Sequence, residues 1–413
     1  MDQIQKPKSQ AVAVPTDNRP LTTAHFLAWI AWSIALAVLI LRHAAGGVDR
    51  VYAFNDYMLA GSHWLRGEYL YGNWRGFIYS PGIAAFFVPL ALLPSVISYG
   101  LWLLLNVAVF LGGFAALLKS NIVPGLDRRS IALCYLLLLF CAVGNLDVGQ
   151  ANPFVAGLLM FAIAAVTHER WSTAALCIAL AAYFKIYPFA LGMLICVIAP
   201  RRFIGRLLLA LLVLAAAPYL FQHWSYVTSQ YQAWVATRVS DQRLNYSLKY
   251  APIDLWFLIH TIAHLPIPAW AYTVIQLGTG GLIALFSIWG LRKNWSIQRL
   301  LCGQFFLVTI WMTLCGPATE AHTYLLMAPA LVIALVKSFR DRQPLLLRTT
   351  IFAAALFQAV HMSRFDHFLH NKHTWVFIPQ PLSALLFLAY CILWLPNEAF
   401  WGEEVVRVSA RRL

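Results

Sequence analysis

Residues 172–199 read STAALCIALAAYFKIYPFALGMLICVIA, and the path of this stretch decides how the chain crosses a membrane. The stretch is either one 28-residue helix or two short helices that break at Lys185-Ile186-Tyr187-Pro188. Proline removes one backbone hydrogen bond, and its ring obstructs the preceding helical turn. The proline therefore favours two helices, and it leaves a cation, Lys185, at the break.

Apolar runs of this kind occur along the whole chain. Hydrophobic residues make up 61% and charged residues 11% of the 413 residues, whereas soluble domains carry about 25% charged residues. A soluble enzyme is therefore excluded, and an all-α polytopic membrane protein is predicted. Twelve membrane spans are expected, over residues 24–41, 97–118, 131–146, 153–166, 172–184, 187–199, 206–221, 270–291, 300–315, 323–336, 346–360 and 377–395.

The basic residues indicate the orientation of these spans. A single helix over 172–199 would place every later basic cluster outside, against the positive-inside rule. With two helices, 20 of the 30 Lys and Arg residues lie on the cytoplasmic side, so the net charge of +14 is an orientation signal and indicates no nucleic-acid partner. We expect cytoplasmic tails (1–23 and 396–413), a transmembrane domain (24–395) and external loops (about 42–96 and 222–269) in a plasma or inner membrane.

Cysteine and histidine patterns give little sign of metal or disulfide chemistry. The seven cysteines lie in apolar runs without a CxxC pair, which is typical of small hydrophobic residues packed between helices. His361, His367, His370 and His373 have metal-like spacing, but they fall in a short external segment that is also typical of a solvated loop. No metal site and no cofactor are predicted.

The first external loop contains the first candidate catalytic residue. Apolar residues follow Asn55-Asp56-Tyr57 at helical spacing, which predicts a helix at the membrane surface that begins at Asp56, soon after the first span. A partly desolvated carboxylate there could act as a general base, or it could cap the helix. Residues 80–94 predict a second interfacial or re-entrant helix.

Three polar clusters follow at external ends of spans: 149–152 (GQAN), 185–188 (KIYP) and 316–322 (GPATEAH). Lys185 lies deep in an apolar stretch, and a cation at that depth is suited to binding the phosphate of a lipid carrier. Alternatively, its long side chain could extend to the membrane surface and place the ammonium group in water. Glu320 and His322 could form a hydrogen-bonded pair or a proton relay, or belong to an ordinary polar turn.

The second external loop mixes polar groups with aromatic residues. Arg238, Asp241, Arg243, Asn245 and Lys249 could grip the hydroxyls of a polyol, although aromatic belts at membrane interfaces have the same composition. The chain has no P-loop and no GxGxxG motif. An activated donor would therefore come from within the membrane or from outside.

These motifs together carry a resemblance to a known family. FNDYMLAGSHWLRGEYLYGNWRGFIYSPGIAAFFVPLALLP (54–94), GQAN, KIYP and the arginines that follow at 201 and 202 resemble glycosyltransferase family 87, the polyprenol-phosphate-dependent mannosyltransferase-like family of the GT-C fold. The resemblance covers about residues 24–395. It implies an enzyme of the cell envelope that moves a hexose, mannose in the first instance, from a polyprenyl-phosphate carrier to a lipid or glycan acceptor hydroxyl outside, with inversion.

The resemblance also implies roles for individual residues. Asp56 matches the catalytic aspartate, and Lys185 matches the lysine of the family's K-x-Y-P motif, so Lys185, Arg75 and Tyr187 are expected to bind the donor phosphate. The expected substrate-binding residues are Tyr57, Tyr79, Gln150, Asn152, Asn245, Glu320 and His322.

One departure from the family pattern affects the substrate. Members often carry a tryptophan-histidine-histidine motif where this chain has GPATEAHTY. Only His322 could take the role of that motif here. The identity of the sugar and of the acceptor is therefore not decided by the sequence. The main alternative is a twelve-span transporter or flippase of a lipid-linked or small polar substrate. Transporters usually repeat their broken helices in two halves, and no second KIYP-like break is found.

Overall fold

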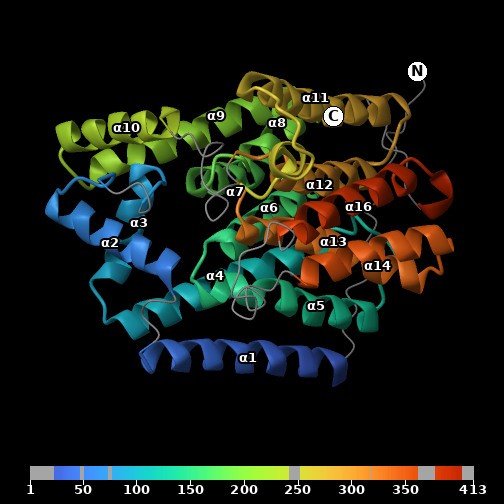
Figure 1. Cartoon of the computed structure of the whole chain (residues 1–413), viewed down its shortest axis with the longest axis horizontal. Coiled ribbons are helices and arrows are strands. Elements are labelled where there is room, and N and C mark those ends of the chain that lie inside the picture. Colours follow the sequence, from blue (N-terminus) through green and yellow to red (C-terminus); the bar gives the residue numbers. More distant parts are fainter. Residues whose placement is uncertain are drawn as a thin grey trace, which may run out of the picture.

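The computed structural model describes residues 23–46, 51–72, 77–240, 252–317, 319–360 and 377–401, and over these ranges it contains helices and no strands (Figure 1). The all-α prediction is confirmed. The α-helices are α1 (Thr23–Ala44), α2 (Tyr52–Arg66), α3 (Pro81–Ala91), α4 (Ser95–Lys119), α5 (Arg128–Asp147), α6 (Asn152–Thr167), α7 (Trp171–Phe184), α8 (Phe189–Ile198), α9 (Pro200–Ala216), α10 (Trp224–Val239), α11 (Ala269–Arg292), α12 (Ile297–Leu314), α13 (Ala328–Arg340), α14 (Leu345–Val360) and α16 (Pro379–Trp394). Short 3₁₀ or π segments are η2 (Ala217–Leu220), η4 (Phe257–Ile262), η5 (Ala321–Leu326) and η7 (Glu398–Phe400).

Each of the twelve apolar runs contains a helix. By length and composition six of these can cross a membrane, namely α1, α4, α5, α9 continued by η2, α11 and α12. The helices α3, α6, α7, α8, α14 and α16 are apolar but shorter. The run 323–336 is not one helix, because η5 gives way to α13 next to Pro329, whose ring disfavours a continuous helix through the preceding turn.

Helix α6 is the centre of the core. Nearly all of its residues are buried, and it packs most extensively against α4. The two backbones approach closely where Gly113 of α4 faces Gly157 of α6, because a Cβ on Gly113 would lie 2.8 Å from the Cα of Gly157. Small residues permit such close packing between membrane helices.

This close approach leads to a prediction about stability. Gly113→Ala is expected to lower the free energy of unfolding by about 1–3 kcal/mol, because the new methyl group overpacks against rigid backbone. Gly278→Ala in α11 is the matched control, since nothing lies within 4 Å of its Cβ position. Thermal unfolding of both variants in the same detergent compares them, and equal melting temperatures would contradict the packing interpretation.

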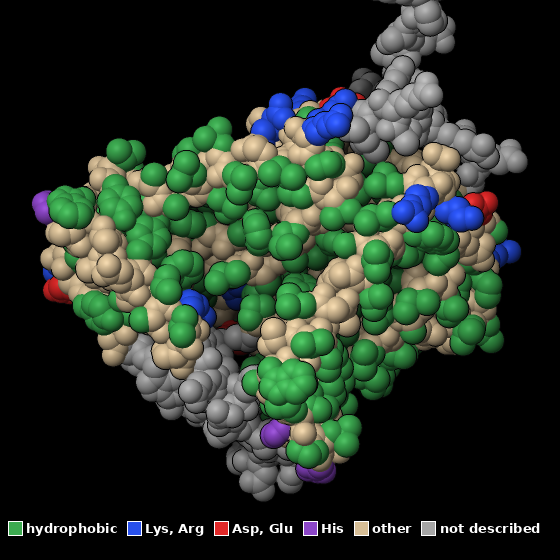
Figure 2. Space-filling model, turned by 90° about the horizontal axis from the view of Figure 1, so that it is seen from above, with side chains coloured by type: hydrophobic (Ala, Val, Ile, Leu, Met, Phe, Trp, Pro, Cys, Tyr) green, Lys and Arg blue, Asp and Glu red, His purple; other side chains and the backbone are tan. Residues whose placement is uncertain are grey.

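The outer helices expose apolar side chains. In Figure 1, α1 and α11 lie at opposite edges of the molecule, and only 22% and 11% of their apolar windows are buried. Figure 2 shows one broad face that is mostly hydrophobic, with Lys and Arg side chains along its upper edge and a hollow near its centre. Such a surface is suited to lipid, so this is a helical membrane protein.

The two regions expected as external loops contain helices of their own. Helix α2 confirms the predicted helix after the first span, with Tyr57, Ala60 and Trp64 buried and Leu65 52% exposed. Helix α3 confirms the second. Helix α10 and η4 in the region 222–269 were not expected, and α10 joins the α2–α3 layer through bonds such as Leu70 N to Gln230 Oε1, 3.1 Å.

The cysteines pack as expected from their apolar surroundings. All are free thiols, and none is exposed: Cys134, Cys302, Cys315 and Cys391 are buried, whereas Cys141, Cys177 and Cys196 are partly buried.

Candidate active site

The break between α7 and α8 lies where the sequence predicts it. Helix α7 ends at Phe184, Lys185 has an extended backbone (φ −146°, ψ 131°), and α8 begins after Pro188. With 14 and 10 residues, the two helices are about 21 and 15 Å long at about 1.5 Å per residue. Both fall short of the roughly 30 Å of hydrocarbon, and the prediction of two half-length helices is confirmed.

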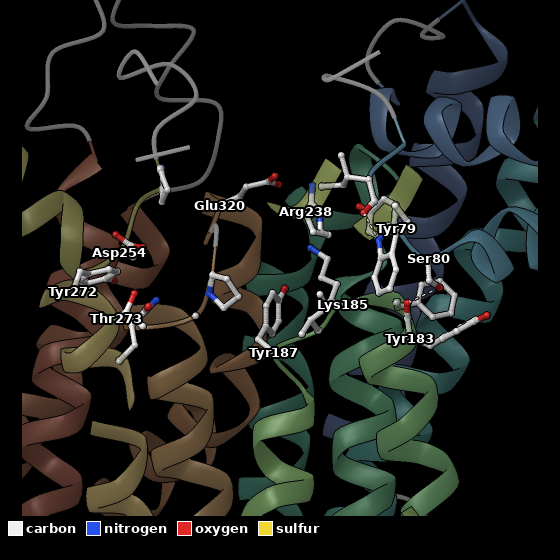
Figure 3. Close-up of a pocket in the computed structure, with 18 of the residues that line it drawn as sticks. Tyr79, Ser80, Tyr183, Lys185, Tyr187, Arg238, Asp254, Tyr272, Thr273 and Glu320 are labelled. Carbon is white, nitrogen blue, oxygen red and sulfur yellow. Dashed lines mark hydrogen bonds between the residues drawn. The ribbon is translucent and has the colours of Figure 1, made fainter. Parts of the chain in front are cut away.

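A cavity of about 370 Å³ opens beside this break. Helices α7, α10 and α11 and the segments around residues 79, 254 and 317 supply its walls, so that residues far apart in the sequence meet there (Figure 3). Its polar or charged lining residues are Tyr79, Ser80, Tyr183, Lys185, Tyr187, Arg238, Asp254, Tyr272, Thr273, Gln276 and Glu320. The volume is within the range of small-ligand sites, which is about 300–1,000 Å³.

One side of the cavity is cationic. In Figure 3 the side chains of Lys185 and Arg238 approach one another on the same side, Lys185 from the α7–α8 break and Arg238 from α10. The Lys185 Nζ atom lies 5.9 Å from the ring centroid of Tyr187. Two cations held together favour an anion between them, and phosphate is the anion that such clusters commonly bind.

The opposite side of the cavity carries Asp254, Tyr272 and Thr273 (Figure 3). Asp254 is 1% exposed, and its Oδ1 accepts a hydrogen bond from Phe257 N at 3.2 Å, at the start of η4. Burial raises the pKa of its carboxyl to about 7. Asp254 was not predicted from the sequence, and Arg238 was predicted only as one of several polar residues that could bind a polyol. The signal for Asp254 was a single acid in the apolar stretch PIDLWF.

Asp56 lies on α2 and is not among the residues that line the cavity, but its carboxyl interacts electrostatically with that of Glu320, which does line it. The N-cap of α2 is Val51, and Asp56 is the fifth residue of the helix, so the alternative role as helix cap is wrong. Burial, followed by the negative charge of Glu320, raises the pKa of Asp56 to about 6. This carboxyl therefore has the property that a general base at neutral pH requires.

Glu320 lies in the wall of the cavity, and His322 lies beside α2. Glu320 also caps η5 in a capping box, in which its side chain accepts a hydrogen bond from the backbone N–H of Thr323 and the Thr323 hydroxyl accepts one from the backbone N–H of Glu320. This structural role agrees with the interpretation of the segment as a polar turn. The ring of His322 lies 6.4 Å from that of Tyr52 on α2. Burial lowers the pKa of His322, and the charges of both Glu320 and Lys185 act on it.

The other predicted site residues lie at different places. Tyr79 lines the cavity, and Tyr57, fully buried behind it, donates a hydrogen bond to Tyr79 at 3.0 Å. Gln150, in the turn before α6, and Asn152, the first residue of α6, are buried and do not line the cavity. Arg75, Asn245 and the four histidines of residues 361–373 lie outside the described residues.

The fold and the cavity together define a helical membrane protein with a polar, phosphate-compatible site among its helices. The profile of glycosyltransferase family 87 matches residues 77–317, more than half of the chain, and the protein belongs to this family. It is therefore a membrane glycosyltransferase, and the resemblance inferred from its motifs is confirmed. The match contains Lys185, Tyr187, Arg238 and Asp254, whereas Asp56, Glu320 and His322 lie outside it.

No curated protein and no solved structure shows significant similarity to this chain.

Proposed function

We propose that the protein is a GT-C-type hexosyltransferase that takes a sugar, mannose in the first instance, from a polyprenyl-phosphate carrier. The observation that carries this proposal is the meeting of Lys185 and Arg238 on one side of a cavity in a glycosyltransferase of family 87. A lipid monophosphate brings the negative charge that two such cations neutralise. The sugar passes to a hydroxyl of a lipid or glycan acceptor outside the cytoplasm.

The proposed orientation places both termini in the cytoplasm and the cavity outside, in a plasma or inner membrane crossed twelve times. It is supported by the basic clusters at 201–206, 292–299 and 337–348, which the positive-inside rule assigns to the cytoplasm. In Figure 2 many Lys and Arg side chains lie along the upper edge, whereas the hollow lies below a broad hydrophobic area and has charged side chains of its own. A lipid-linked donor could then reach the cavity from the bilayer.

The proposed reaction is a single displacement with inversion. The Asp56 carboxylate takes the proton of the acceptor hydroxyl, and the freed oxygen attacks the anomeric carbon. The bond between that carbon and the phosphate oxygen breaks, and its electron pair stays on the phosphate. Lys185 and Arg238 stabilise this developing charge, with Tyr187 beside Lys185, while Glu320, His322 and Tyr79 help to hold the substrates.

The donor class can be tested directly. The purified protein in lipid vesicles is supplied either with polyprenyl-phosphate mannose or with a soluble nucleotide sugar, together with a membrane extract as acceptor source. We expect radiolabelled sugar to be transferred only from the lipid donor, since the chain has no nucleotide-binding motif. The product should have the anomeric configuration opposite to that of the donor, as read by nuclear magnetic resonance. Transfer from the nucleotide sugar alone would overturn the proposal.

A further inference from the structure

The turn 149–152 lies against the helix that carries Asp56. Phe54 of α2 donates a backbone hydrogen bond to Val148 O at 3.4 Å, and the backbone N–H of Ala151 bonds to the Tyr57 hydroxyl. Gly149 has φ +70°, and a Cβ there would lie 2.5 Å from the Cβ of Phe54. A residue without a side chain is therefore required for α2 to pack this closely.

Asn152 extends this turn to the segment that contains Glu320 and His322. Its Nδ2 group donates to Asn145 Oδ1 and to the backbone carbonyl of His322, both at 2.8 Å. The side chain is fully buried, and its Oδ1 has no hydrogen-bond partner among the described residues. An unsatisfied buried acceptor costs about 1–3 kcal/mol, so stability alone does not favour asparagine here.

We propose that Asn152 is a positioning residue that fixes the Glu320–His322 segment against the turn 149–152, and thereby sets the place of Glu320 relative to Asp56. The inference deepens the proposed function, on which it rests. Gly149 packs against Phe54 of α2, and Asn152, three residues further on, bonds to His322 O in η5, so this short stretch contacts the elements that carry or adjoin Asp56 and Glu320.

Other bonds also hold the Glu320 segment, among them one from Gln380 Nε2 of α16 to Ala321 O at 3.0 Å. Ile253 N donates to Thr319 O, and Tyr324 Oη donates to Ile253 O, both at 2.8 Å. These bonds tie the segment to the wall of the cavity that carries Asp254. The bond from Asn152 ties it to the side of Asp56. Loss of the Asn152 bond therefore removes the side-chain hydrogen bond that joins His322 O to α6 and leaves the bonds to Ile253 in place.

This geometry has an electrostatic consequence for Asp56. The negative charge of Glu320 disfavours a second negative charge on Asp56, so it contributes to the raised pKa of Asp56. If Glu320 moves away, the pKa of Asp56 falls. The acid limb of the activity profile then moves to lower pH, and the proton acceptor becomes weaker.

The test compares Asn152→Ala with Asn106→Ala. Asn106 is also a fully buried asparagine; its side chain accepts a hydrogen bond from Phe154 N near the start of the same helix at 3.1 Å and donates one to Trp102 O at 3.0 Å. We expect Asn152→Ala to lower kcat about tenfold to a hundredfold, as displaced catalytic groups do, with little change in the KM for the donor. Its acid limb should move to lower pH, whereas that of Asn106→Ala should not move.

Hydrogen–deuterium exchange separates this inference from the proposed function, because it needs no activity. Amides of residues 319–326 should exchange faster in Asn152→Ala than in Asn106→Ala or in the wild-type protein. Equal exchange in the two variants would overturn the positioning role, even if sugar transfer is confirmed. So would an Asn152→Ala variant whose kcat falls while the acid limb of its activity profile stays in place. If Asn152→Ala does not fold, Asn152→Ser replaces it, because serine keeps one hydrogen-bond donor. Residues 319–326 should then exchange faster in Asn152→Ser than in the wild-type protein. Exchange equal to that of Asn106→Ala would overturn the inference.

Discussion

Replacing Asp56 with asparagine is expected to reduce sugar transfer by about 10²–10⁴-fold, the typical contribution of a general base. The amide is nearly the same size as the carboxyl, so α2 keeps its packing, but the amide cannot accept the hydroxyl proton. Binding of the donor should be preserved, because the cations of the cavity lie on other helices. Single-turnover transfer from polyprenyl-phosphate mannose, in vesicles that contain equal amounts of folded protein, measures the loss.

The pH dependence of the wild-type enzyme gives a second readout of Asp56. A base acts only when it is deprotonated, and burial with the Glu320 charge raises the pKa of Asp56 to about 6. Activity should therefore be full above this pKa and fall as the pH drops through about 6. Glu68→Gln is the matched control, since Glu68 follows α2, is exposed and pairs with Arg66 at 2.8 Å. It should leave both rate and profile unchanged. If Asp56→Asn kept most of the activity, Asp254, the buried acid that lines the cavity, would become the candidate base.

Replacing Lys185 with alanine is expected to reduce kcat/KM for the donor by about 10²–10³-fold, as removal of one group that stabilises the charge of the transition state does. The leaving phosphate loses one of its two cations, and Arg238 alone neutralises it less well. The KM for the donor should rise, whereas the preference among acceptors should not change. Initial rates at varied donor and varied acceptor concentration distinguish the two effects.

Two further variants sharpen this experiment. Lys185→Arg keeps the positive charge and should retain more activity than the alanine variant, although its planar group fits a different geometry. Lys293→Ala removes an exposed lysine that follows α11 and should have no effect on transfer. A Lys185→Ala variant that changes acceptor preference while its donor KM stays normal would contradict the assignment to phosphate.

Local sequence patterns predicted much of the fold. Pro188 fixed the place of the helix break, and the spacing of Tyr57, Ala60 and Trp64 predicted α2, because both effects act within a few residues. The split between η5 and α13 was missed, although Pro329 marks it. Helix α10 was missed because its aromatic and polar residues have the composition of a membrane interface.

The candidate site was predictable only in part. Lys185 stands out because a cation is costly in an apolar stretch, and Asp56 because it lies in the helix expected soon after the first span, although that helix begins four residues earlier, at Tyr52. Arg238 and Asp254 become site residues only through the packing of α10 and α11 around the cavity, which no local pattern encodes. Asn152 was expected to bind substrate, whereas its bond to a residue 170 positions away could not be predicted from a local pattern.

The walls of the cavity come from Tyr79, Lys185, Arg238 and Glu320, which span most of the chain. During synthesis, the ribosome must therefore add 320 of the 413 residues before the last wall exists. Until then Lys185 and Arg238 face the growing bundle without Glu320 and Asp254 arranged opposite them. The lining of the cavity is therefore complete only after residue 320 has been added.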